Sequence, residues 1–291
     1  MKTLTEKAYA KLNLSLDVVS RLDSGYHGMR MVMQSVSLCD DVTICVKEGS
    51  GVIHVHTNRF YLPVGEDNLA GKAAKAFLRR IENSKFDVEI AIRKRIPVCA
   101  GLGGGSSDAA AVLRGLNRLL KAGLTLSELE ELGLQIGSDV PYCIAGGTAL
   151  AEGRGEQLTA LSHLSCADVV ICKPRFSVST PELFRKIDGI AITVRPDTEG
   201  IIQAVNEGRF SDAARRVLNV FEQVPARGSG EIARIRKTMT DHGALGAAMS
   251  GTGSAVFGLF DSPEKAKTAF QELRARYREC FLCRTMERLQ L

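Results

Sequence analysis

The segment from Pro97 to Ala111, PVCAGLGGGSSDAAA, constrains the structure of this chain more than any other feature. It places four glycines in the five positions 101–105, between an apolar run typical of a strand and an alanine-rich run typical of a helix. Glycine accepts positive φ angles and lets the backbone approach a ligand closely. We expect Ser106 and Ser107 to cap the helix, whose first N–H groups lack partners within it. Free N–H groups and the positive end of the helix dipole favour an anion, so the segment predicts a phosphate site.

Two other glycine-rich phosphate loops do not match this segment. A Walker A loop needs a lysine and then Ser or Thr after its last glycine, whereas Gly105 is followed by Ser-Ser-Asp. A Rossmann fingerprint that starts at Gly101 would need Gly or Ala at its last position, where this chain has Ser106. The remaining alternative is a flexible turn between a strand and a helix.

Composition describes an ordinary globular protein that handles small molecules. A length of 291 residues suggests two domains, and 45% hydrophobic and 24% charged residues are typical values. The net charge of +5 is spread over short basic runs such as 93–95, and Trp is absent, so the chain is not expected to bind nucleic acid. No apolar run approaches 18 residues and the first residues lack a secretory apolar block, so we expect a cytoplasmic protein without a membrane span.

The cysteines and histidines do not suggest a metal site. The eight cysteines mostly lie in apolar runs and are expected to be reduced core thiols: 39, 45, 99, 143, 166, 172, 280 and 283. Cys280 and Cys283 form a lone CxxC without a second pair, so zinc is not expected. His54 and His56 share one strand face without a third ligand nearby, which favours a surface strand.

Periodicity predicts an α+β protein with strands concentrated in the first 60 residues. Leu12, Leu14, Leu16 and Val18 alternate with polar residues, which indicates a half-buried strand. Further strands are expected at 31–38, 42–47, 52–56, 87–93, 147–151, 168–172, 246–249, 255–260 and 280–287. Helices are expected at 68–82, 106–121, 126–136, 180–187, 198–207, 210–220, 228–242 and 262–277. The character of the pattern changes after Glu156, so we divide the chain into domains 1–158 and 159–291.

Three further clusters carry polar groups, and each has an ordinary structural explanation when taken alone. Lys11 and Asn13 lie on the polar face of the first strand, where an exposed strand face is the alternative. Asp139 follows Gly-Ser in a loop that leaves a helix and is stiffened by Pro141, where the alternative is a simple Asx turn. The segment SGTGS at 250–254 lets the backbone close on a phosphate between two apolar segments, where the alternative is a tight hairpin.

Together, and in this order, these segments resemble the GHMP kinase superfamily of galactose, homoserine, mevalonate and phosphomevalonate kinases. The motifs that carry the resemblance are AKLNL at 10–14, DSGYH at 23–27, EDNL at 66–69, the glycine segment, IGSDVP at 136–141 and SGTGS at 250–254. The Gly-Tyr-His element at 25–27 points to the members whose substrate carries cytidine. Cys99 departs from the usual Gly or Ala, and the thiol is small enough to leave the loop intact.

The resemblance implies a two-domain fold and a reaction. It implies an N-terminal α/β domain with a left-handed crossover, against the general right-handed rule, and a C-terminal ferredoxin-like domain, with ATP and substrate in the cleft between them. The implied reaction moves the γ-phosphoryl group of ATP to the 2-hydroxyl of the methylerythritol unit of a cytidine diphosphate alcohol. That reaction belongs to the non-mevalonate route to isoprenoids.

The resemblance also assigns roles to residues. Asp139 would accept the proton of the attacking hydroxyl, and Lys11 would keep that carboxylate ionised and offset charge on the phosphoryl group. Asn13 would lie near the acceptor hydroxyl, and cytosine would lie among Tyr26, His27 and Phe184. The ATP-binding residues would be Asn68, Lys94, Pro97, Val98, Cys99, Ala100, Gly101, Leu102, Gly103, Gly104, Gly105, Ser106 and Ser107. Mg²⁺ is expected with ATP, and its ligands stay open: Asp108 is a candidate, or only a first-turn helix charge.

Two alternatives remain at this point. One is another small-molecule kinase of the superfamily, for mevalonate or homoserine. The other is a non-catalytic ligand sensor on the same fold, although Lys11 and Asp139 are both present. In either case we expect a monomer or homodimer with small-molecule partners and no tightly bound cofactor.

Overall fold

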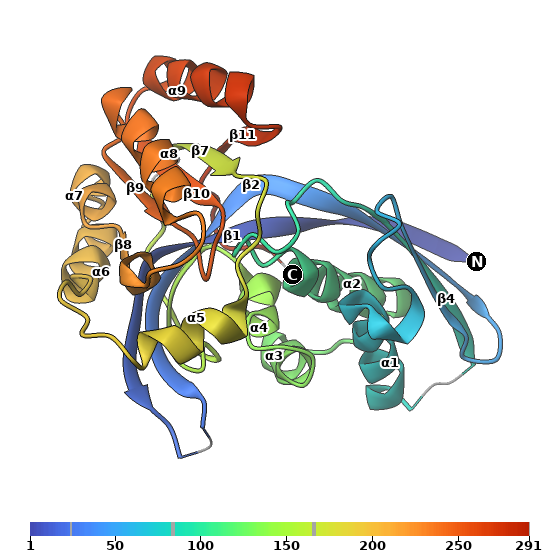
Figure 1. Cartoon of the computed structure of the whole chain (residues 1–291). Helices are drawn as coiled ribbons and strands as arrows, with labels where there is room; N and C mark the ends of the chain where they lie inside the picture. The colour runs from blue at the N-terminus through green and yellow to red at the C-terminus, as the bar shows by residue number, and fades with distance from the viewer. Residues whose placement is uncertain (24, 83–84, 165–166, 291) are drawn as a thin grey trace.

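The computed structural model describes residues 1–23, 25–82, 85–164 and 167–290 and contains two sheets. In Figure 1 the long strands β1 and β2, in blue, run across the molecule, and α8 and α9, in orange and red, lie at the top. The first sheet is formed by β1 (Lys2–Arg21), β2 (His27–Glu48), β3 (Ile53–Thr57), β4 (Phe86–Arg93), β5 (Thr148–Gly153), β6 (Gln157–Ala160) and β8 (Leu218–Asn219). Its helices are α1 (Leu69–Arg80), α2 (Gly104–Leu120), α3 (Leu126–Leu134) and α4 (Val140–Ala145).

The second sheet is antiparallel, with the strand order β11-β7-β10-β9. It consists of β7 (Asp168–Lys173), β9 (Gly246–Met249), β10 (Val256–Phe260) and β11 (Glu279–Arg284). The helices of this half are α5 (Thr180–Ile187), α6 (Thr198–Asn206), α7 (Phe210–Arg215), α8 (Ser229–Asp241) and α9 (Pro263–Arg276). The order β7-α8-β9-β10-α9-β11 along the chain is that of a ferredoxin-like unit, as expected.

The first two strands are longer than the sequence predicted. The separate strands expected at 31–38 and 42–47 are one strand, because Cys39 and Asp40 between them continue the pairing with β1. β3 and β4 are parallel neighbours joined through α1, which forms the crossover of this half. β4 and β5 both pair with β2, and β8 pairs with β1. The long antiparallel pair β1–β2 therefore forms the centre of the first sheet.

Both faces of β1 are buried around its middle, whereas the sequence predicted one exposed face. Leu12 and Leu14 pack in a cluster with residues of the second sheet such as Phe257. On the opposite face Lys11 and Asn13 are also covered, with exposures of 4% and 0%. The expected half-buried strand was wrong here, because β1 lies between the two halves of the molecule.

Segments from each half complete the other. The helix expected at 210–220 ends at Arg215, and Leu218 and Asn219 pair in parallel with Ser15 and Leu16 as an edge strand. β11 ends at Arg284, earlier than the expected residue 287. The next residue, Thr285, pairs with Val36 of β2 in an isolated bridge. The division into 1–158 and 159–291 stays a prediction.

Most of the described cysteines are buried thiols; Cys45 is half-buried and Cys99 is exposed. Of the seven in the described residues, all are free and five are buried, whereas Cys166 lies outside the described residues. Burial raises the pKa of Cys143 and of Cys283 to about 12, which keeps these thiols protonated and unreactive. Cys99 is exposed in the glycine segment. Among the described residues, no helix is long and apolar enough to cross a bilayer.

Candidate functional site

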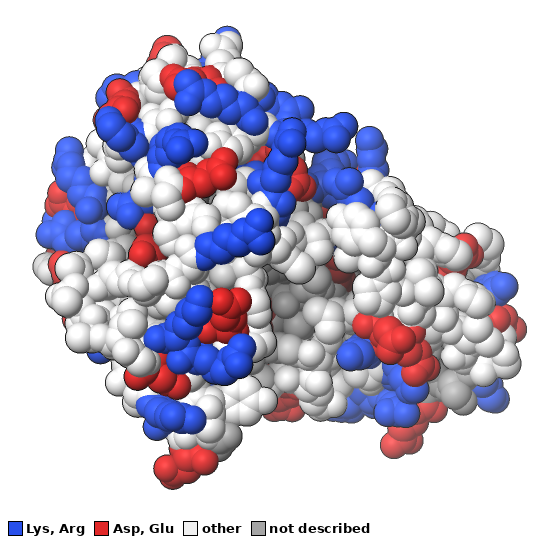
Figure 2. Space-filling view, viewed as in Figure 1, with Lys and Arg blue, Asp and Glu red and all other residues white. Residues whose placement is uncertain are grey.

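A hollow of about 960 Å³ lies between the two halves of the molecule, and we call it the glycine-loop hollow. Figure 2 shows the recess between the two halves. Ten of the residues singled out from the sequence line it: Lys11, Asn13, Tyr26, His27, Cys99, Gly101, Gly103, Ser106, Asp139 and Phe184. Residues far apart in the chain therefore meet at one site.

The glycine segment begins α2 earlier than predicted. Gly103 precedes the helix with a left-handed backbone, and α2 starts at Gly104, so Ser106 and Ser107 lie in its first turn and do not cap it. The Ser107 N–H donates to the Gly103 carbonyl, and the earlier N–H groups of the first turn have no partner within the helix. These N–H groups, with Gly103 and Ser106 at the wall of the hollow, fit an anion.

The two glycine-rich loops are joined to each other. The Ser250 hydroxyl donates to the Gly101 carbonyl at 2.9 Å, and the Ala255 N–H donates to the Ala100 carbonyl at 3.1 Å. A Cβ on Gly101 would lie 1.9 Å from the Ser250 carbonyl oxygen. Gly101 therefore has a packing role in addition to any close approach to a ligand. Thr252 of the second loop also lines the hollow.

Lys11 and Asp139 form an ion pair at the floor of the hollow. Lys11 Nζ lies 3.5 Å from Asp139 Oδ2 and donates to Asn13 Oδ1 at 2.8 Å. The Lys11 side chain is 5% exposed and that of Asp139 is 33% exposed, so the carboxylate remains accessible. Asp139 immediately precedes α4, a short helix that the sequence interpretation missed, and Pro141 lies in its first turn. Proline there supplies the φ angle a helix start needs, which holds Asp139 in place.

Aromatic rings form the opposite wall. The ring centroids of His27 and Phe184 are 4.8 Å apart with an interplanar angle of 31°, and Phe184 packs edge-on against Phe221. Tyr26 is 59% exposed and carries the Arg154 guanidinium at 5.4 Å from its ring centroid. This wall can hold a planar ring.

Asp188 is a site residue that the sequence interpretation did not identify. Its Oδ1 lies 2.6 Å from His27 Nε2, and it lines the hollow. Because a carboxylate can only accept, Nε2 carries the proton and Nδ1 of a neutral His27 is left as an acceptor. The available signal was spacing: Asp188, the residue just after α5, follows Phe184 by four positions, which is about one helical turn.

The remaining predicted residues lie outside the wall of the hollow. Asn68 caps α1 by accepting from the Ala70 N–H at 3.0 Å. Lys94 is buried, with Nζ 2.5 Å from both Asp40 Oδ2 and Asp108 Oδ2. Several further residues of the glycine segment do not line this hollow: Pro97, Val98, Ala100, Leu102, Gly104, Gly105 and Ser107. The assignment of these residues to ATP binding stays a prediction.

Asp108, the candidate metal ligand, is engaged with Lys94. It is nine-tenths buried, its Oδ1 has no hydrogen-bond partner among the described residues, and burial raises its pKa to about 7. The described residues contain no group of three or more His, Cys, Asp or Glu that could hold a metal ion.

Comparisons with known proteins assign the family of the chain. Residues 68–147 match the model of the GHMP kinases N terminal domain, and residues 194–279 match that of the GHMP kinases C terminal domain. The chain is 42% identical to the 4-diphosphocytidyl-2-C-methyl-D-erythritol kinase of Alkaliphilus oremlandii over 98% of this chain and 97% of that protein. It is also 42% identical to the protein of the same name from Acetivibrio thermocellus, over 98% of this chain and 100% of that one.

Solved structures give the same result. A crystal structure of 4-(cytidine 5'-diphospho)-2C-methyl-D-erythritol kinase, 34% identical, superimposes with a TM-score of 0.80 over 97% of this chain and 99% of that one. Homoserine kinase from Cytophaga hutchinsonii, 19% identical, has a TM-score of 0.77 over 100% of this chain and 96% of its own. At that identity the second match supports the fold alone.

Proposed function

The chain belongs to the GHMP kinase family, among the 4-diphosphocytidyl-2-C-methyl-D-erythritol kinases, and we propose that it phosphorylates the 2-hydroxyl of that cytidine diphosphate alcohol with ATP. The products are the 2-phosphate and ADP, and the reaction serves the synthesis of isoprenoid precursors. The observation that carries the proposal is that one hollow is lined by the Lys11–Asp139 pair, the glycine segment and the His27–Phe184 ring pair.

ATP binds with its phosphates at the start of α2. The N–H groups of the first turn and of the glycine segment hold the phosphates, and the helix dipole adds to their affinity. Cys99, Gly101, Gly103 and Ser106 contact the nucleotide at the wall of the hollow. Asn68 and Lys94 hold the adjoining end of α1 and the loop in shape.

Asp139 acts as the base, and Lys11 supports it. Phosphoryl transfer passes through a loose transition state, so position and charge neutralisation account for most of the catalysis. Asp139 takes the proton of the attacking hydroxyl. Lys11, 3.5 Å away, forms an ion pair with the carboxylate and offsets charge on the moving phosphoryl group. Asn13, bonded to Lys11 Nζ, orients the ammonium group and lies next to the acceptor.

Cytosine binds between the rings of the opposite wall. Phe184 stacks on the base, Tyr26 covers its outer edge, and His27 Nδ1 accepts from the exocyclic amino group. Asp188 fixes the tautomer and the direction of the His27 ring. Such a wall distinguishes a cytidine substrate from mevalonate or homoserine, neither of which has a base to stack.

Magnesium accompanies ATP, and the residues present fit an ion held mainly by phosphate oxygens and water. Magnesium usually keeps several waters and uses one or two protein carboxylates. Asp108 is neutralised by Lys94, so it serves the fold of the loop, and Asp139 is the accessible carboxylate near the phosphates. The ion supplies charge neutralisation at the phosphates. The enzyme works in the cytoplasm as a monomer or homodimer, without a tightly bound cofactor.

A phosphotransfer assay with three acceptors tests the proposal. ADP release should be rapid with the cytidine diphosphate alcohol and near background with mevalonate and homoserine. A preference for either of the other acceptors would favour another kinase of the superfamily. No transfer to any of the three, with ATP binding intact, would favour the non-catalytic sensor.

A further inference from the structure

A second and larger hollow of about 1230 Å³ lies where the two halves meet, and it shares no lining residue with the glycine-loop hollow. We call it the basic hollow, because seven of its lining residues are Lys or Arg and one, Glu279, is acidic. Figure 2 shows Lys and Arg side chains gathered on the upper part of the molecule, where α9 lies in Figure 1.

Three of the seven basic groups are neutralised by carboxylates of the protein. Lys94 is bonded to Asp40 and Asp108, Arg95 to Asp41, and Lys173 lies 3.7 Å from Glu279. The other four are the guanidinium groups of Arg59, Arg175, Arg274 and Arg278. None of these four has a carboxylate partner among the described residues, and Arg274 donates only to the Arg278 carbonyl.

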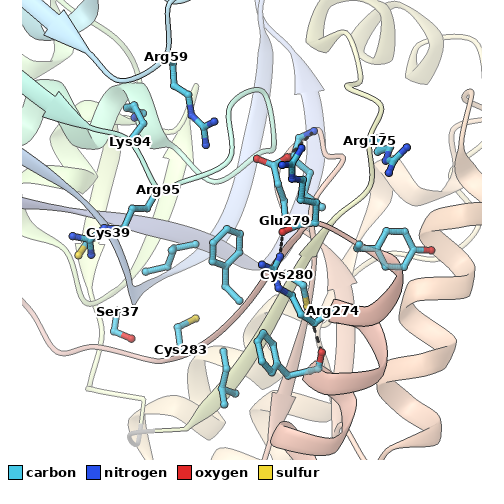
Figure 3. A pocket seen from close by; sticks show the side chains of 17 residues that line it. Ser37, Cys39, Arg59, Lys94, Arg95, Arg175, Arg274, Glu279, Cys280 and Cys283 are labelled. Carbon is cyan, nitrogen blue, oxygen red and sulfur yellow. Dashed lines mark hydrogen bonds and ion pairs between the residues drawn. The ribbon is translucent and has the colours of Figure 1, made fainter.

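These four groups come from three segments and line the same hollow. Arg59 lies in the loop after β3, Arg175 in the loop after β7, and Arg274 and Arg278 at the end of α9 and just beyond it. In Figure 3, Arg59 lies on one side of the hollow with Lys94 and Arg95, and Arg175 and Arg274 lie on the other. Like charges brought together by the fold repel one another, and an anion between them relieves that repulsion.

The chemistry of the four groups specifies the anion. A guanidinium presents a planar fork of donors that matches phosphate oxygens in pairs, and it stays charged at any physiological pH. A single phosphate carries about two negative charges, which leaves half of the four groups unmatched. A diphosphate group matches them more fully. The apolar side chains of Leu38, Phe270 and Phe281 line the same hollow and can cover an uncharged part of such a ligand.

We propose that the basic hollow is a second ligand site, which binds a diphosphate group between Arg59, Arg175, Arg274 and Arg278. The ligand would contact both halves of the molecule. The site is separate from the glycine-loop hollow and does not depend on the reaction proposed for it. The diphosphate group is free diphosphate or part of an organic diphosphate, and the test distinguishes these two sources.

Isothermal titration calorimetry tests the site directly. Inorganic diphosphate is titrated into the full-length protein whose glycine-loop hollow is saturated with a non-hydrolysable ATP analogue at fixed magnesium. Binding to the wild-type protein is expected, and the Arg175→Gln/Arg274→Gln variant should bind at least about tenfold more weakly, because two charge-assisted contacts are lost. An alkyl diphosphate titrated in parallel should bind more tightly than inorganic diphosphate if the apolar wall is used, and equally if free diphosphate is the ligand.

The control is the Arg79→Gln/Arg227→Gln variant, which loses the same charge from exposed positions outside both hollows. It should bind diphosphate within about twofold of wild type. Both variants should keep the wild-type melting temperature and affinity for the ATP analogue. Three results would each overturn the proposal. The first is no diphosphate binding to the wild-type protein, and the second is equally weakened diphosphate binding in the control variant. The third is a loss of ATP-analogue affinity in the Arg175→Gln/Arg274→Gln variant, which would make the hollow part of the nucleotide site. Failure of the phosphotransfer assay would leave this result unaffected.

Discussion

Lys94 Nζ lies 2.5 Å from Asp108 Oδ2, and this buried ion pair joins the two ends of the glycine segment. Lys94 precedes the segment at the end of β4, and Asp108 lies in the first turns of α2. Asp40 on β2 completes the cluster: its Oδ2 lies 2.5 Å from Lys94 Nζ, and its Oδ1 accepts from the Ile96 N–H at 2.8 Å. Buried side chains that do not line the glycine-loop hollow therefore stabilise the conformation of the loop.

Removing the cation of this cluster should destabilise the fold strongly. In Lys94→Met two carboxylates are left buried without a counter-charge, and breaking a buried pair in this way costs about 3–5 kcal/mol. Urea unfolding measures the loss. The Lys94→Met/Asp108→Leu variant should lose clearly less than the sum of its single variants, because the two residues act on each other. Losses below about 1 kcal/mol, or simply additive ones, would mean that the cluster does not support the loop.

The ionisation of Asp108 should make stability depend on pH. Burial raises its pKa from 3.8 to about 7, with Lys94 opposing and Asp40 adding to the shift. The folded protein then keeps a proton that the unfolded chain releases, so the contribution of Asp108 is full below pH 3.8 and is lost as the pH rises towards about 7. The free energy of unfolding of wild type minus that of Asp108→Asn should therefore fall across this interval, by at most about 1.4 kcal/mol per pH unit.

Asp87 provides a control of opposite sign. Hydrogen bonds from the N–H groups of Val52 and Ser50 lower its pKa below 3.8, so its contribution is present above that pH and is lost as the pH falls. The same difference measured for Asp87→Asn should rise with pH at the acid end and be flat near pH 7. A flat difference for Asp108→Asn across the whole interval would contradict the assignment.

Gly101 should tolerate no side chain. In Gly101→Ala the new Cβ meets the Ser250 carbonyl oxygen, and the residue keeps a φ of +76°. We expect a loss of about 1–3 kcal/mol in stability and weaker ATP binding, because the two glycine-rich loops must separate. Gly123→Ala is the matched control: its φ is +70° but nothing lies within 4 Å of the new Cβ, so it measures the backbone strain alone. Equal losses in the two variants would show that the contact with Ser250 is unimportant.

Asp139 and Lys11 should act as one unit in catalysis. Asp139→Asn should leave ATP binding nearly intact and reduce turnover by about 10²–10⁴-fold, nearer the lower figure if the transition state is loose. Lys11→Met should be similarly damaging, and the double variant should lose far less than the product of the single losses. Single-turnover rates with calorimetric ATP affinities measure both quantities. Near-normal turnover in Asp139→Asn would exclude it as the base.

The aromatic wall should control the acceptor and not ATP. Phe184→Ala should raise KM for the cytidine substrate by about 5–150-fold, the equivalent of about 1–3 kcal/mol of base stacking. Asp188→Asn should also raise this KM, because Asp188 orients the His27 ring. The control is Asp241→Asn on α8, which changes an exposed carboxylate outside the glycine-loop hollow and should leave KM unchanged. A lower melting temperature with unchanged KM in Phe184→Ala would assign the ring to core packing only.

Local patterns in the sequence were enough for the elements nearest the site. The glycine segment predicted a strand, a tight turn and a helix with free N–H groups, and each is present between β4 and α2. These features depend on neighbours in the chain, through φ preferences, helix ends and apolar periodicity, so they can be read without the fold. The same periodicity missed α4 and misjudged β1, whose second face is covered by residues far away in the chain.

Contacts between distant segments were decided only by the tertiary structure. The meeting of Lys94 with Asp40 and Asp108, the hydrogen bond between His27 and Asp188, and the gathering of four arginines without a carboxylate partner in the described part of the chain each join segments whose residue types are individually unremarkable. Electrostatic interactions and burial depend on which residues are close in space. The sequence around a charged residue therefore does not show whether its partner is water, a carboxylate or a ligand. The sequence by itself thus predicted the phosphate loop and, through the family motifs, the reaction; the fold decided which of the predicted residues line the glycine-loop hollow and which do not.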